Sequence, residues 1–273
     1  MAGQIVQPPA ANDVRPGGLL AAATTPTDQL TRNVPVKYVG VPCGGGWKTY
    51  AVDCDASTAA QDHGYGDGTD EVTGHPFLIQ VERSCSTFGW QVEDYETRVR
   101  AHLTQIESAA VAREFWTGEL TKVAGWSDQV YLTDTANADD ITPAGGAVSV
   151  NAGYARIQQA LGEMLSGEPG AIHVSRRLLG YTNPAGMRRE GNNILDLFDN
   201  RIVADSGYPD SGDATGVIYG TARPVVRRSA VEVTPGTLAE AVDRAHNTIT
   251  YSANRLATVT AGCGVVAVRV TLS

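Results

Sequence analysis

The stretch from Gln91 to Gly118 is the feature that most constrains the fold, because no Gly or Pro interrupts it before its last residue. Its apolar residues recur at steps of three or four, which places them on one stripe of an α-helix: Val92, Tyr95, Val99, Leu103, Ile106 and Ala110. A helix of about 25 residues is about 37 Å long at 1.5 Å per residue. We therefore expect a long spine helix with sheet packed against its apolar stripe.

The charged side chains of this stretch fall away from the stripe, and we expect them to face outward. Two acid-first pairs at i,i+4 support the helix: Asp94 with Arg98, and Glu96 with Arg100. Gln105 and Glu107 are also off the stripe. At the other end, Phe115 and Trp116 are expected to anchor a core or an interface, and Gly118 stands where a helix would stop.

The whole chain excludes several classes of protein. Its 273 residues allow one large domain or two modest ones. A net charge of −9 without blocks of like charge disfavours direct binding to duplex DNA. No apolar run could span a bilayer, and the first residues lack the pattern of a secretory signal, so we expect a cytosolic protein where it is made. The four cysteines form no C-x-x-C pair and match no known zinc spacing, so free structural thiols are expected.

Residues 1–35 are expected to form an extended arm. Five prolines are scattered through Ala, Thr and Gly, which excludes a long helix or a central strand. The segment has too few apolar residues for a core of its own. We expect a neighbouring subunit to order it.

Residues 36–54 predict two strands around the glycines at 44–46, and residues 55–76 predict a long polar loop. The loop carries four acidic residues that raise the question of calcium: Asp62, Asp67, Asp70 and Glu71. Their order does not match an EF-hand, so a solvated loop is the expectation.

The rest of the chain alternates short strands with helices, which indicates an α+β protein. Helices are expected at 151–166 and from Thr237, where T-L-A-E is a capping box. A loop is expected at 134–149. Strands or extended segments are expected at 77–81, 131–132, 171–175, 200–209, 216–233, 247–260 and 265–272.

Motifs for catalysis are absent from the sequence. There is no phosphate-binding loop, no G-x-G-x-x-G and no G-x-S-x-G, since Ser206 lacks the leading Gly. His173 is expected to be a satisfied core or surface histidine, and nothing in the sequence places Cys85 beside it. We therefore assign no catalytic, cofactor-binding or metal-ligating residue, expect no cofactor, and do not expect an enzyme.

The C-terminal run NTITYSANRLATVTAGCGVVAVRVTL, with Arg255, Ala267 and Val268, resembles the close of tailed-bacteriophage major capsid proteins. Residues 171–209 are similar to the axial-domain stretch of actinobacteriophage capsid proteins. The order of elements also resembles this family, whose Hong Kong 97-type fold is shared with encapsulins. The resemblance implies an α+β capsid fold with five segments: an N-terminal arm at 1–35, an extended hairpin loop at 36–76, a peripheral domain with the spine helix at 77–122, an α/β axial domain at 123–215, and a long strand, helix and C-terminal strands returning to both domains at 216–273.

The same resemblance implies a major capsid protein that self-assembles, as hexamers and pentamers, into the icosahedral head of a tailed bacteriophage. It implies a location in the virion, synthesis in the host cytoplasm, packaged double-stranded DNA as a neighbour without sequence-specific contact, and no membrane partner. Scaffold, portal or decoration proteins are further candidate partners.

Some relatives join a loop Lys to an Asn of a neighbouring subunit through a covalent cross-link. Lys48 is the one candidate for such a cross-link in this chain, and no partner motif accompanies it. The alternatives are an encapsulin-type nanocompartment shell and a small cytosolic hydrolase.

Overall fold

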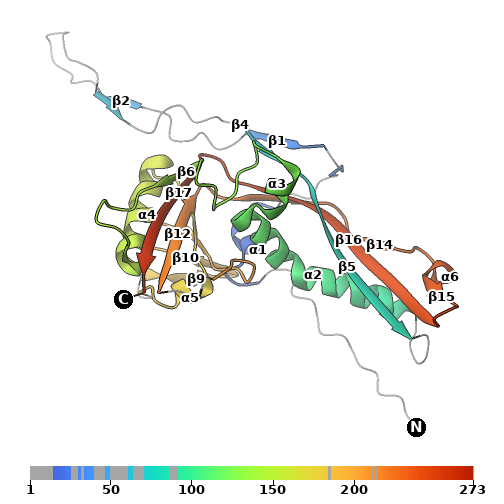
Figure 1. The fold of residues 1–273 in the computed structure, drawn as a ribbon. Helices are drawn as coiled ribbons and strands as arrows, with labels where there is room; N and C mark the ends of the chain where they lie inside the picture. Colours follow the sequence, from blue (N-terminus) through green and yellow to red (C-terminus); the bar gives the residue numbers. More distant parts are fainter. Residues whose placement is uncertain are drawn as a thin grey trace.

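The computed structural model describes residues 15–25, 30–31, 34–39, 47–49, 61–63, 71–86, 92–183, 186–210, 212 and 214–272. These residues form two lobes, each built on its own β-sheet; one hydrophobic cluster extends across both lobes and a second lies within one of them. Figure 1 shows the lobe with α2, β5 and β16 on the right and the lobe with α4, β12 and β17 on the left. We call them the helix lobe and the α/β lobe.

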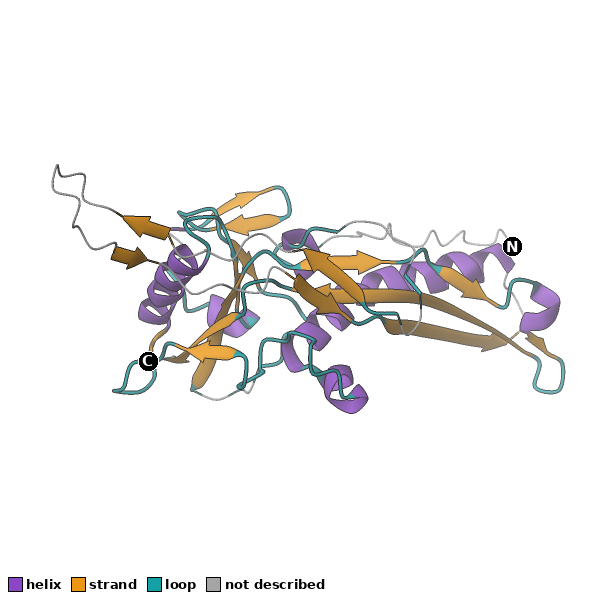
Figure 2. Cartoon of the chain, turned by 90° about the horizontal axis from the view of Figure 1, so that it is seen from above, coloured by secondary structure: helices purple, strands orange, loops and turns teal. Residues whose placement is uncertain are grey.

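The helix lobe is organised by one long central strand, β16 (Thr248–Thr260). Along one side β16 pairs antiparallel with β5 (Phe77–Ser86). Along the other side it pairs antiparallel with three short strands: β13 (Val225–Arg228), β14 (Glu232–Thr234) and β15 (Val242–Asp243). Figure 2 shows the longest helix lying along the long strands of this lobe.

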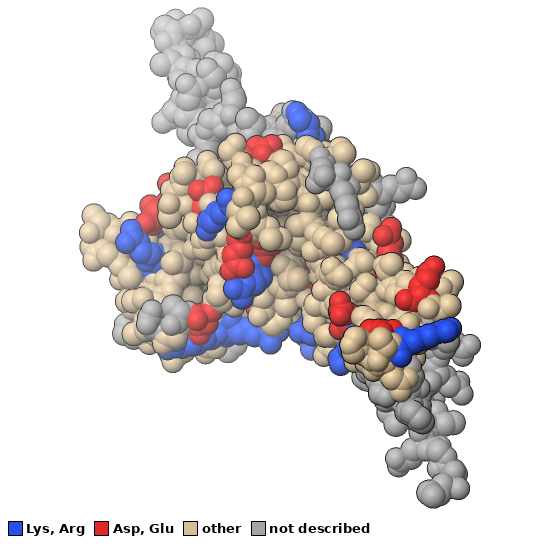
Figure 3. All heavy atoms as spheres, turned by 45° about the vertical axis from the view of Figure 1, so that its right-hand side comes forward, with Lys and Arg blue, Asp and Glu red and all other residues tan. Residues whose placement is uncertain are grey.

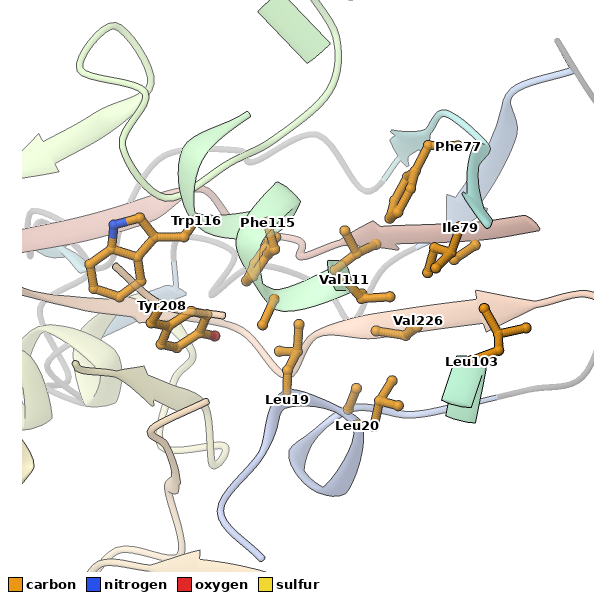
Figure 4. Packing of buried hydrophobic residues seen from close by; sticks show 14 of the residues in the cluster. Leu19, Leu20, Phe77, Ile79, Leu103, Val111, Phe115, Trp116, Tyr208 and Val226 are labelled. Carbon is orange, nitrogen blue, oxygen red and sulfur yellow. The ribbon is translucent and has the colours of Figure 1, made fainter. Parts of the chain in front are cut away.

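That helix is α2 (Val92–Thr117), and it confirms the predicted spine. Tyr95, Val99 and Leu103 from the stripe are buried, and Ile106 and Ala110 pack against the same cluster. Gly118 ends the helix with a φ of 59°, the left-handed conformation that Gly adopts without a steric penalty. The cluster joins the stripe to Phe77 and Ile79 of β5, to Phe115 and Trp116, and to Val226 of β13 (Figure 4).

The α/β lobe contains an eight-stranded mixed sheet. Its main order is β6 (Ala138–Asp140), β17 (Val265–Thr271), β12 (Thr215–Thr221), β8 (Ala171–His173), β11 (Arg201–Val203), β10 (Asn193–Leu195) and β9 (Arg188–Glu190), and β7 (Val148–Ser149) also pairs with β17. β6 and β7 run parallel to β17, and β8 runs parallel to β11. The remaining pairs are antiparallel.

The two faces of this sheet are covered by different parts of the chain. Ile172, Ile202 and Ile218 pack in the cluster of α4 (Val150–Met164), whereas Val203 and Tyr219 belong to the cluster that contains α2. Gly153 lets α4 approach closely, because a Cβ there would lie 2.3 Å from Cγ1 of Val270. The sheet of the α/β lobe therefore packs against the end of the spine helix through one face and against α4 through the other.

The region around 36–76 differs from the predicted local hairpin. β1 (Val36–Val39) pairs with β4 (Glu71–Gly74), and β2 (Trp47–Thr49) pairs with β3 (Gln61–His63). The segment predicted as a polar loop therefore contributes two strands. Tyr38 shows why β1 pairs with β4. Its side chain is buried, and its hydroxyl forms a 2.6 Å hydrogen bond with Oγ1 of Thr258. This contact anchors β1 to the helix lobe, where β4 leads into β5.

The N-terminal segment also differs from expectation. Residues 19–22 form a short helix, α1 (Leu19–Ala22), and Leu19, Leu20 and Ala22 are buried in the subunit's own core (Figure 4). The prediction that a neighbouring subunit orders this segment is therefore wrong for residues 15–25. The prediction for residues 1–14 lies outside the described residues.

Smaller differences follow from contacts that are distant in sequence. Residues 131–132 form no strand, because Leu132 instead donates its backbone N–H to Phe115 at the end of α2. The expected loop at 134–149 contains β6 and β7. The helix after Thr237 is shortened to α6 (Leu238–Ala241), since Val242 pairs with β16. The short helices α3 (Glu119–Ala124) and α5 (Arg176–Leu179) complete the fold.

The prediction of free thiols is wrong for Cys263, which is disulfide-bonded. The side chains of the other three cysteines lie outside the described residues. Cys263 follows β16 at the turn into β17, a site with a φ of 64°. No C-x-x-C spacing in the sequence indicates such a pairing.

Candidate functional site: the junction of the two lobes

Asp205 is the centre of the junction between the lobes. Its side chain is buried, and Oδ2 accepts hydrogen bonds from the backbone N–H of Leu19 at 2.8 Å and from the hydroxyl of Ser108 at 2.6 Å. Its Oδ1 accepts from the backbone N–H of Gly207 at 3.1 Å. One carboxylate therefore connects α1, α2 and the loop that follows β11.

The chain comes unusually close to α2 at this point. A Cβ at Gly207 would lie 2.0 Å from the carbonyl oxygen of Ala109, so only Gly fits against the helix backbone there. Gly18 is similarly close to Asp205, because a Cβ at Gly18 would lie 2.9 Å from Oδ2 of that carboxylate. At these two glycines the strap, the loop after β11 and α2 are therefore in direct contact.

Residues 15–25, which we call the N-terminal strap, cross this junction and bind to both lobes. Arg15 donates from Nη2 to the carbonyl of Gln105 on α2 at 2.6 Å. Gly17 accepts from the backbone N–H of Ala204 at 2.8 Å, next to β11. Farther along, Thr24 accepts from the N–H of Val226 in β13 at 2.9 Å. The strap thus fixes the position of the α/β lobe relative to the helix lobe.

A second buried carboxylate, Glu107, lies on α2 and corrects the prediction that it faces outward. Its side chain is fully buried and accepts hydrogen bonds from Arg255 of β16 at 2.9 and 3.0 Å and from Arg228 of β13 at 3.1 Å. A buried charge requires such partners. Gln105 is exposed, and Arg100 is exposed and pairs with Glu96 as predicted. The side chain of Asp94 lies outside the described residues.

His173 is a satisfied core histidine, as predicted. Its Nδ1 and Nε2 lie 2.7 Å from the hydroxyl of Tyr208 and 2.9 Å from Oγ1 of Thr221. Burial lowers the pKa of His173 to about 3 and raises the pKa of Tyr208. Trp116 packs on Tyr208 with ring centroids 4.6 Å apart, which confirms that Trp116 is a core anchor.

The residues that could have supported catalysis are not brought together. His173 belongs to the sheet of the α/β lobe, whereas the backbone of Cys85 belongs to β5 in the helix lobe. Ser206 receives a hydrogen bond from Arg15 at 3.3 Å and lies beside the buried Asp205. Among the described residues, the geometry of these side chains builds a junction between lobes and does not pair a nucleophile with a base.

The described residues also bear on metal and membrane binding. Within the described part of the chain, no group of three or more His, Cys, Asp or Glu side chains is arranged to hold a metal ion. The side chains of the candidate calcium residues Asp62, Asp67, Asp70 and Glu71, and that of Lys48, lie outside the described residues. Among the described helices, none is long and apolar enough to cross a membrane.

A rigid turn at the end of the α/β lobe presents apolar side chains to solvent. Leu197 and Phe198 are 73% and 64% exposed. The buried Asp196 holds the turn, because its Oδ1 accepts from the backbone N–H groups of Phe198 and Asn200 at 2.8 and 2.9 Å. Large apolar side chains exposed on a turn whose backbone is fixed by hydrogen bonds are typical of contact sites between proteins.

The chain is similar to known proteins in its fold and not in its sequence. No protein family pattern and no curated protein sequence matches the chain. In contrast, the capsid of an empty GTA particle matches with a TM-score of 0.54 at 13% identity, covering 99% of this chain and 100% of that chain. The SrpI encapsulin of Synechococcus elongatus matches with a TM-score of 0.57 at 8% identity, covering 100% and 93% of the two chains. A chain of Mycobacterium phage Cain matches with a TM-score of 0.53 at 12% identity, covering 98% and 94%.

These neighbours share the whole architecture and not one lobe alone, since each alignment covers nearly the full length of both chains. At such low identity the likeness concerns the fold. The order of elements, with a hairpin region before a spine helix, a mixed sheet, and two C-terminal strands that return to different lobes, is the one expected from the sequence resemblance. The chain has the α+β, Hong Kong 97-type fold found in phage capsid proteins and encapsulins.

Proposed function

We propose that this protein is the major capsid protein of a tailed bacteriophage and that copies of it assemble into the icosahedral head around double-stranded DNA. The observation that carries the proposal is the full-length match to the capsid of a GTA particle and to chains from mycobacterial and microbacterial phages. In this role the protein is a structural subunit and not an enzyme. It is made in the host cytoplasm and ends in the virion.

The shape of the subunit supports assembly through contacts between different surfaces. β1 and β4 leave the helix lobe as a two-stranded ladder, and β2 and β3 form a second ladder with no third strand among the described residues. A two-stranded ribbon is marginally stable alone. It gains stability when it lies on a neighbouring copy, and such head-to-tail contacts close into rings when the rotation permits. Hexamers and pentamers are the rings that an icosahedral shell needs.

Within this proposal the five expected segments acquire roles. They are the N-terminal segment at 1–35, of which residues 15–25 form the strap, the extended hairpin loop at 36–76, the peripheral domain at 77–122, the axial domain at 123–215 and the returning strands at 216–273. The exposed turn at Leu197 and Phe198 lies in the axial segment, and burial in a ring contact would remove both side chains from water. Scaffold, portal or decoration proteins are the further partners that such a head would use.

Electron microscopy of the purified, full-length protein tests the proposal. A capsid subunit gives closed particles of megadalton mass, and size-exclusion chromatography places them in the void volume. A monodisperse small oligomer at all protein concentrations and in all salts would contradict it. Leu197→Ser together with Phe198→Ser should reduce assembly while circular dichroism of the subunit stays unchanged. The matched control is Val123→Ser, because Val123 is 88% exposed on α3, in a different part of the surface.

A nanocompartment shell of the encapsulin type is the second candidate, because the match to the SrpI encapsulin covers the whole chain with a TM-score of 0.57. Both candidates give closed particles, so the contents distinguish them. Particles purified from the native source should contain double-stranded DNA if the first proposal is right. A protein cargo without DNA would favour the second.

A further inference from the structure

The outer edge of β5 (Phe77–Ser86) is unpaired within the part of the chain that the structure describes. There, β5 pairs only with β16, in a register that runs unbroken over all ten residues of the strand. No described residue forms a backbone hydrogen bond with the opposite edge. Native proteins usually protect such edges with short strands, Pro, Lys or a bulge. The sequence of β5, FLIQVERSCS, contains neither Pro nor Lys, and its register contains no bulge.

The hydrogen bonds of β16 identify the residues of β5 whose backbone groups point outward. Leu256 donates its N–H to Oγ of Ser229 at 3.0 Å and accepts from the N–H of Ser229 at 2.9 Å, on the side of β16 away from β5. Because this direction alternates along an antiparallel strand, the backbone groups of Arg255 face Ile79 of β5, with which Arg255 is paired. The backbone groups of every second residue of β5 therefore point away from β16: Leu78, Gln80, Glu82, Ser84 and Ser86.

The same alternation divides the side chains of β5 between two faces. Side chains on the inner face are buried in the cluster that contains α2: Phe77, Ile79 and Val81. The other face is exposed from Leu78 to Ser84 and carries one charge, that of Glu82. The surface of the helix lobe, which comes forward in Figure 3, shows acidic and basic side chains mixed among largely uncharged surface. The edge therefore lacks the block of like charge that would repel a second strand.

We infer that β5 pairs antiparallel with β5 of a second copy of this chain, about a two-fold axis at Val81, so that two helix lobes share one continuous sheet. The choice of a second copy rests on the proposed function, in which copies of the chain surround each subunit. Strand length supports β5 as the partner strand. The other strands at the edges of the described sheets have two to four residues, so they would leave most of the ten-residue edge of β5 unpaired.

Charge complementarity selects the position of the axis. With the axis at Val81, Gln80 lies opposite Glu82 of the second copy, where an amide N–H donates to a carboxylate. Moving the axis by one residue would place the two Glu82 side chains opposite each other, and like charges in that position are destabilising. In the selected register Leu78 lies opposite Ser84 of the second copy. The outward backbone groups of all four residues then find partners across the contact.

This contact differs in symmetry from the contacts within a ring. A two-fold contact uses the same surface on both copies and joins only two of them. Rings of five or six copies need head-to-tail contacts between two different surfaces. Pairing through β5 therefore joins subunits of neighbouring rings, and it gives the open edge of the helix lobe a role in closing the shell.

Charge substitutions at Gln80 in the full-length chain test the register. Each two-fold contact contains the Gln80–Glu82 pair twice. Gln80→Lys should therefore tighten the dimer by roughly 2- to 30-fold, and Gln80→Glu should weaken it by a similar factor, from two cross-strand charge pairs. Sedimentation velocity of subunits before assembly gives the dimer dissociation constant. Gln159→Lys and Gln159→Glu are the matched controls, because Gln159 is exposed on α4 in the other lobe, and both should leave the constant unchanged.

A disulfide test examines the pairing itself. Opposite residues in a hydrogen-bonded pair have Cα atoms about 5.5 Å apart, which a disulfide can span. Leu78→Cys combined with Ser84→Cys should therefore give disulfide-linked dimers under mild oxidation. Each single variant should give none above the wild-type level, because two copies of one position lie roughly 20 Å apart in this register. Comparison on non-reducing gels with the wild type and the single variants accounts for the native cysteines.

Three results would overturn the inference: no additional dimer from the double variant, as much dimer from either single variant, or equal effects of Gln80→Lys and Gln80→Glu. A different occupant of the edge, such as β1 or β4 of a neighbouring copy, would give the first of these results. Electron microscopy of the same proteins tests the proposed function separately. Closed shells without the cross-link would reject the pairing of β5 and leave the capsid proposal standing. Cross-linked dimers that never form shells would support the pairing and reject the capsid proposal.

Discussion

The carboxylate of Glu107 on the spine helix accepts hydrogen bonds from one nitrogen of Arg255 on the central strand, at 3.0 Å through Oε1 and 2.9 Å through Oε2. The two residues are 148 positions apart in the sequence. Arg228 of β13 contacts the same carboxylate, so one buried acid connects α2 to two strands of the sheet. Because burial of a charge without a partner is costly, this contact fixes how the helix lies on the sheet.

Replacing Glu107 with Ala should therefore destabilise the subunit strongly. The change leaves Arg228 and Arg255, which are 23% and 19% exposed, without their shared carboxylate. Removal of one partner of a buried pair typically costs about 3–5 kcal/mol. Urea unfolding of unassembled subunits measures the free energy of unfolding. Arg113→Ala, which breaks an exposed pair with Glu119, is the control and should have a far smaller effect on the free energy of unfolding, because water screens an exposed ion pair. An equal effect of both substitutions would contradict the proposed role of Glu107.

Deletions in the N-terminal segment should distinguish the contribution of the strap to subunit stability from that of the residues before it. Removal of residues 2–14 leaves every described contact of the strap in place, so the subunit should keep its melting temperature. Removal of residues 2–25 deletes the buried Leu19 and Leu20 and uncovers Asp205, and should give insoluble or much less stable protein. Thermal unfolding of the two truncated chains makes the comparison. A stable subunit without residues 2–25 would show that the strap is dispensable for folding.

The buried His173 should make stability depend on pH in the acidic range. Its folded-state pKa of about 3 lies below the ordinary value of 6.5, so between these values the unfolded chain binds a proton that the folded chain does not. Protonation of His173 therefore does not lower the free energy of unfolding above pH 6.5, and lowers it progressively as the pH falls toward 3. Between pH 6.5 and pH 5 this loss is roughly 2 kcal/mol, at 1.36 kcal/mol per pH unit.

Urea unfolding at pH 7, 6 and 5 measures this dependence. In His173→Gln the slope of stability against pH over this range should decrease, whatever the absolute stability of the variant. His246→Gln is the control, because the His246 side chain is 77% exposed and lies in a turn. A slope that is unchanged in His173→Gln, or reduced as much in His246→Gln, would assign the pH dependence to other groups.

Local pattern is sufficient to predict the elements whose signals are local. The spine helix, its apolar stripe and its end at Gly118 follow from periodicity and one glycine, and the strands β16 and β17 follow from β-branched residues in alternation. The local sequence pattern does not show which sheet each strand joins. β16 and β17 are separated by a short turn and belong to different lobes, because their partners come from β5 and β12.

Partners that are distant in the sequence explain the errors. Periodicity places Glu107 on the outer face, since nothing local indicates two arginines that approach from β13 and β16. The three glycines at 44–46 favour a local hairpin, whereas β1 pairs with β4 and Tyr38 is anchored at Thr258. At the junction, the run of residues 205–207 carries the signal of a turn, and that signal does not reveal its contact with α2.

Covalent cross-linking through Lys48 stays a prediction, and we expect it to be absent. No motif for a partner Asn accompanies the lysine in the sequence. Denaturing gel electrophoresis of mature particles should give a single band near the monomer mass of 28.8 kDa. A ladder of higher bands that disappears in Lys48→Arg would show that the link forms; a ladder that persists in this variant and disappears on reduction would be due to disulfides.

The last prediction concerns Leu103, which points from the spine helix into the core and is fully buried. Truncation of a buried Leu costs about 2–5 kcal/mol, a large share of the roughly 5–15 kcal/mol that is typical of a domain. Leu103→Ala should therefore lower subunit yield and the urea midpoint. Gln105→Ala, two residues away, should change the free energy of unfolding by less than about 0.5 kcal/mol, because the side chain is exposed and Arg15 binds only its backbone carbonyl.

The two variants also separate folding from assembly. If the exposed side of α2 takes part in contacts between copies, Gln105→Ala reduces the yield of closed particles while the urea midpoint of the subunit is unchanged. Leu103→Ala should have the opposite effect: the isolated subunit loses stability, and the size of the particles that do form is unchanged. Normal stability of Leu103→Ala would mean that the helix does not hold the sheet of its own subunit, and the arrangement of the helix lobe would then be wrong.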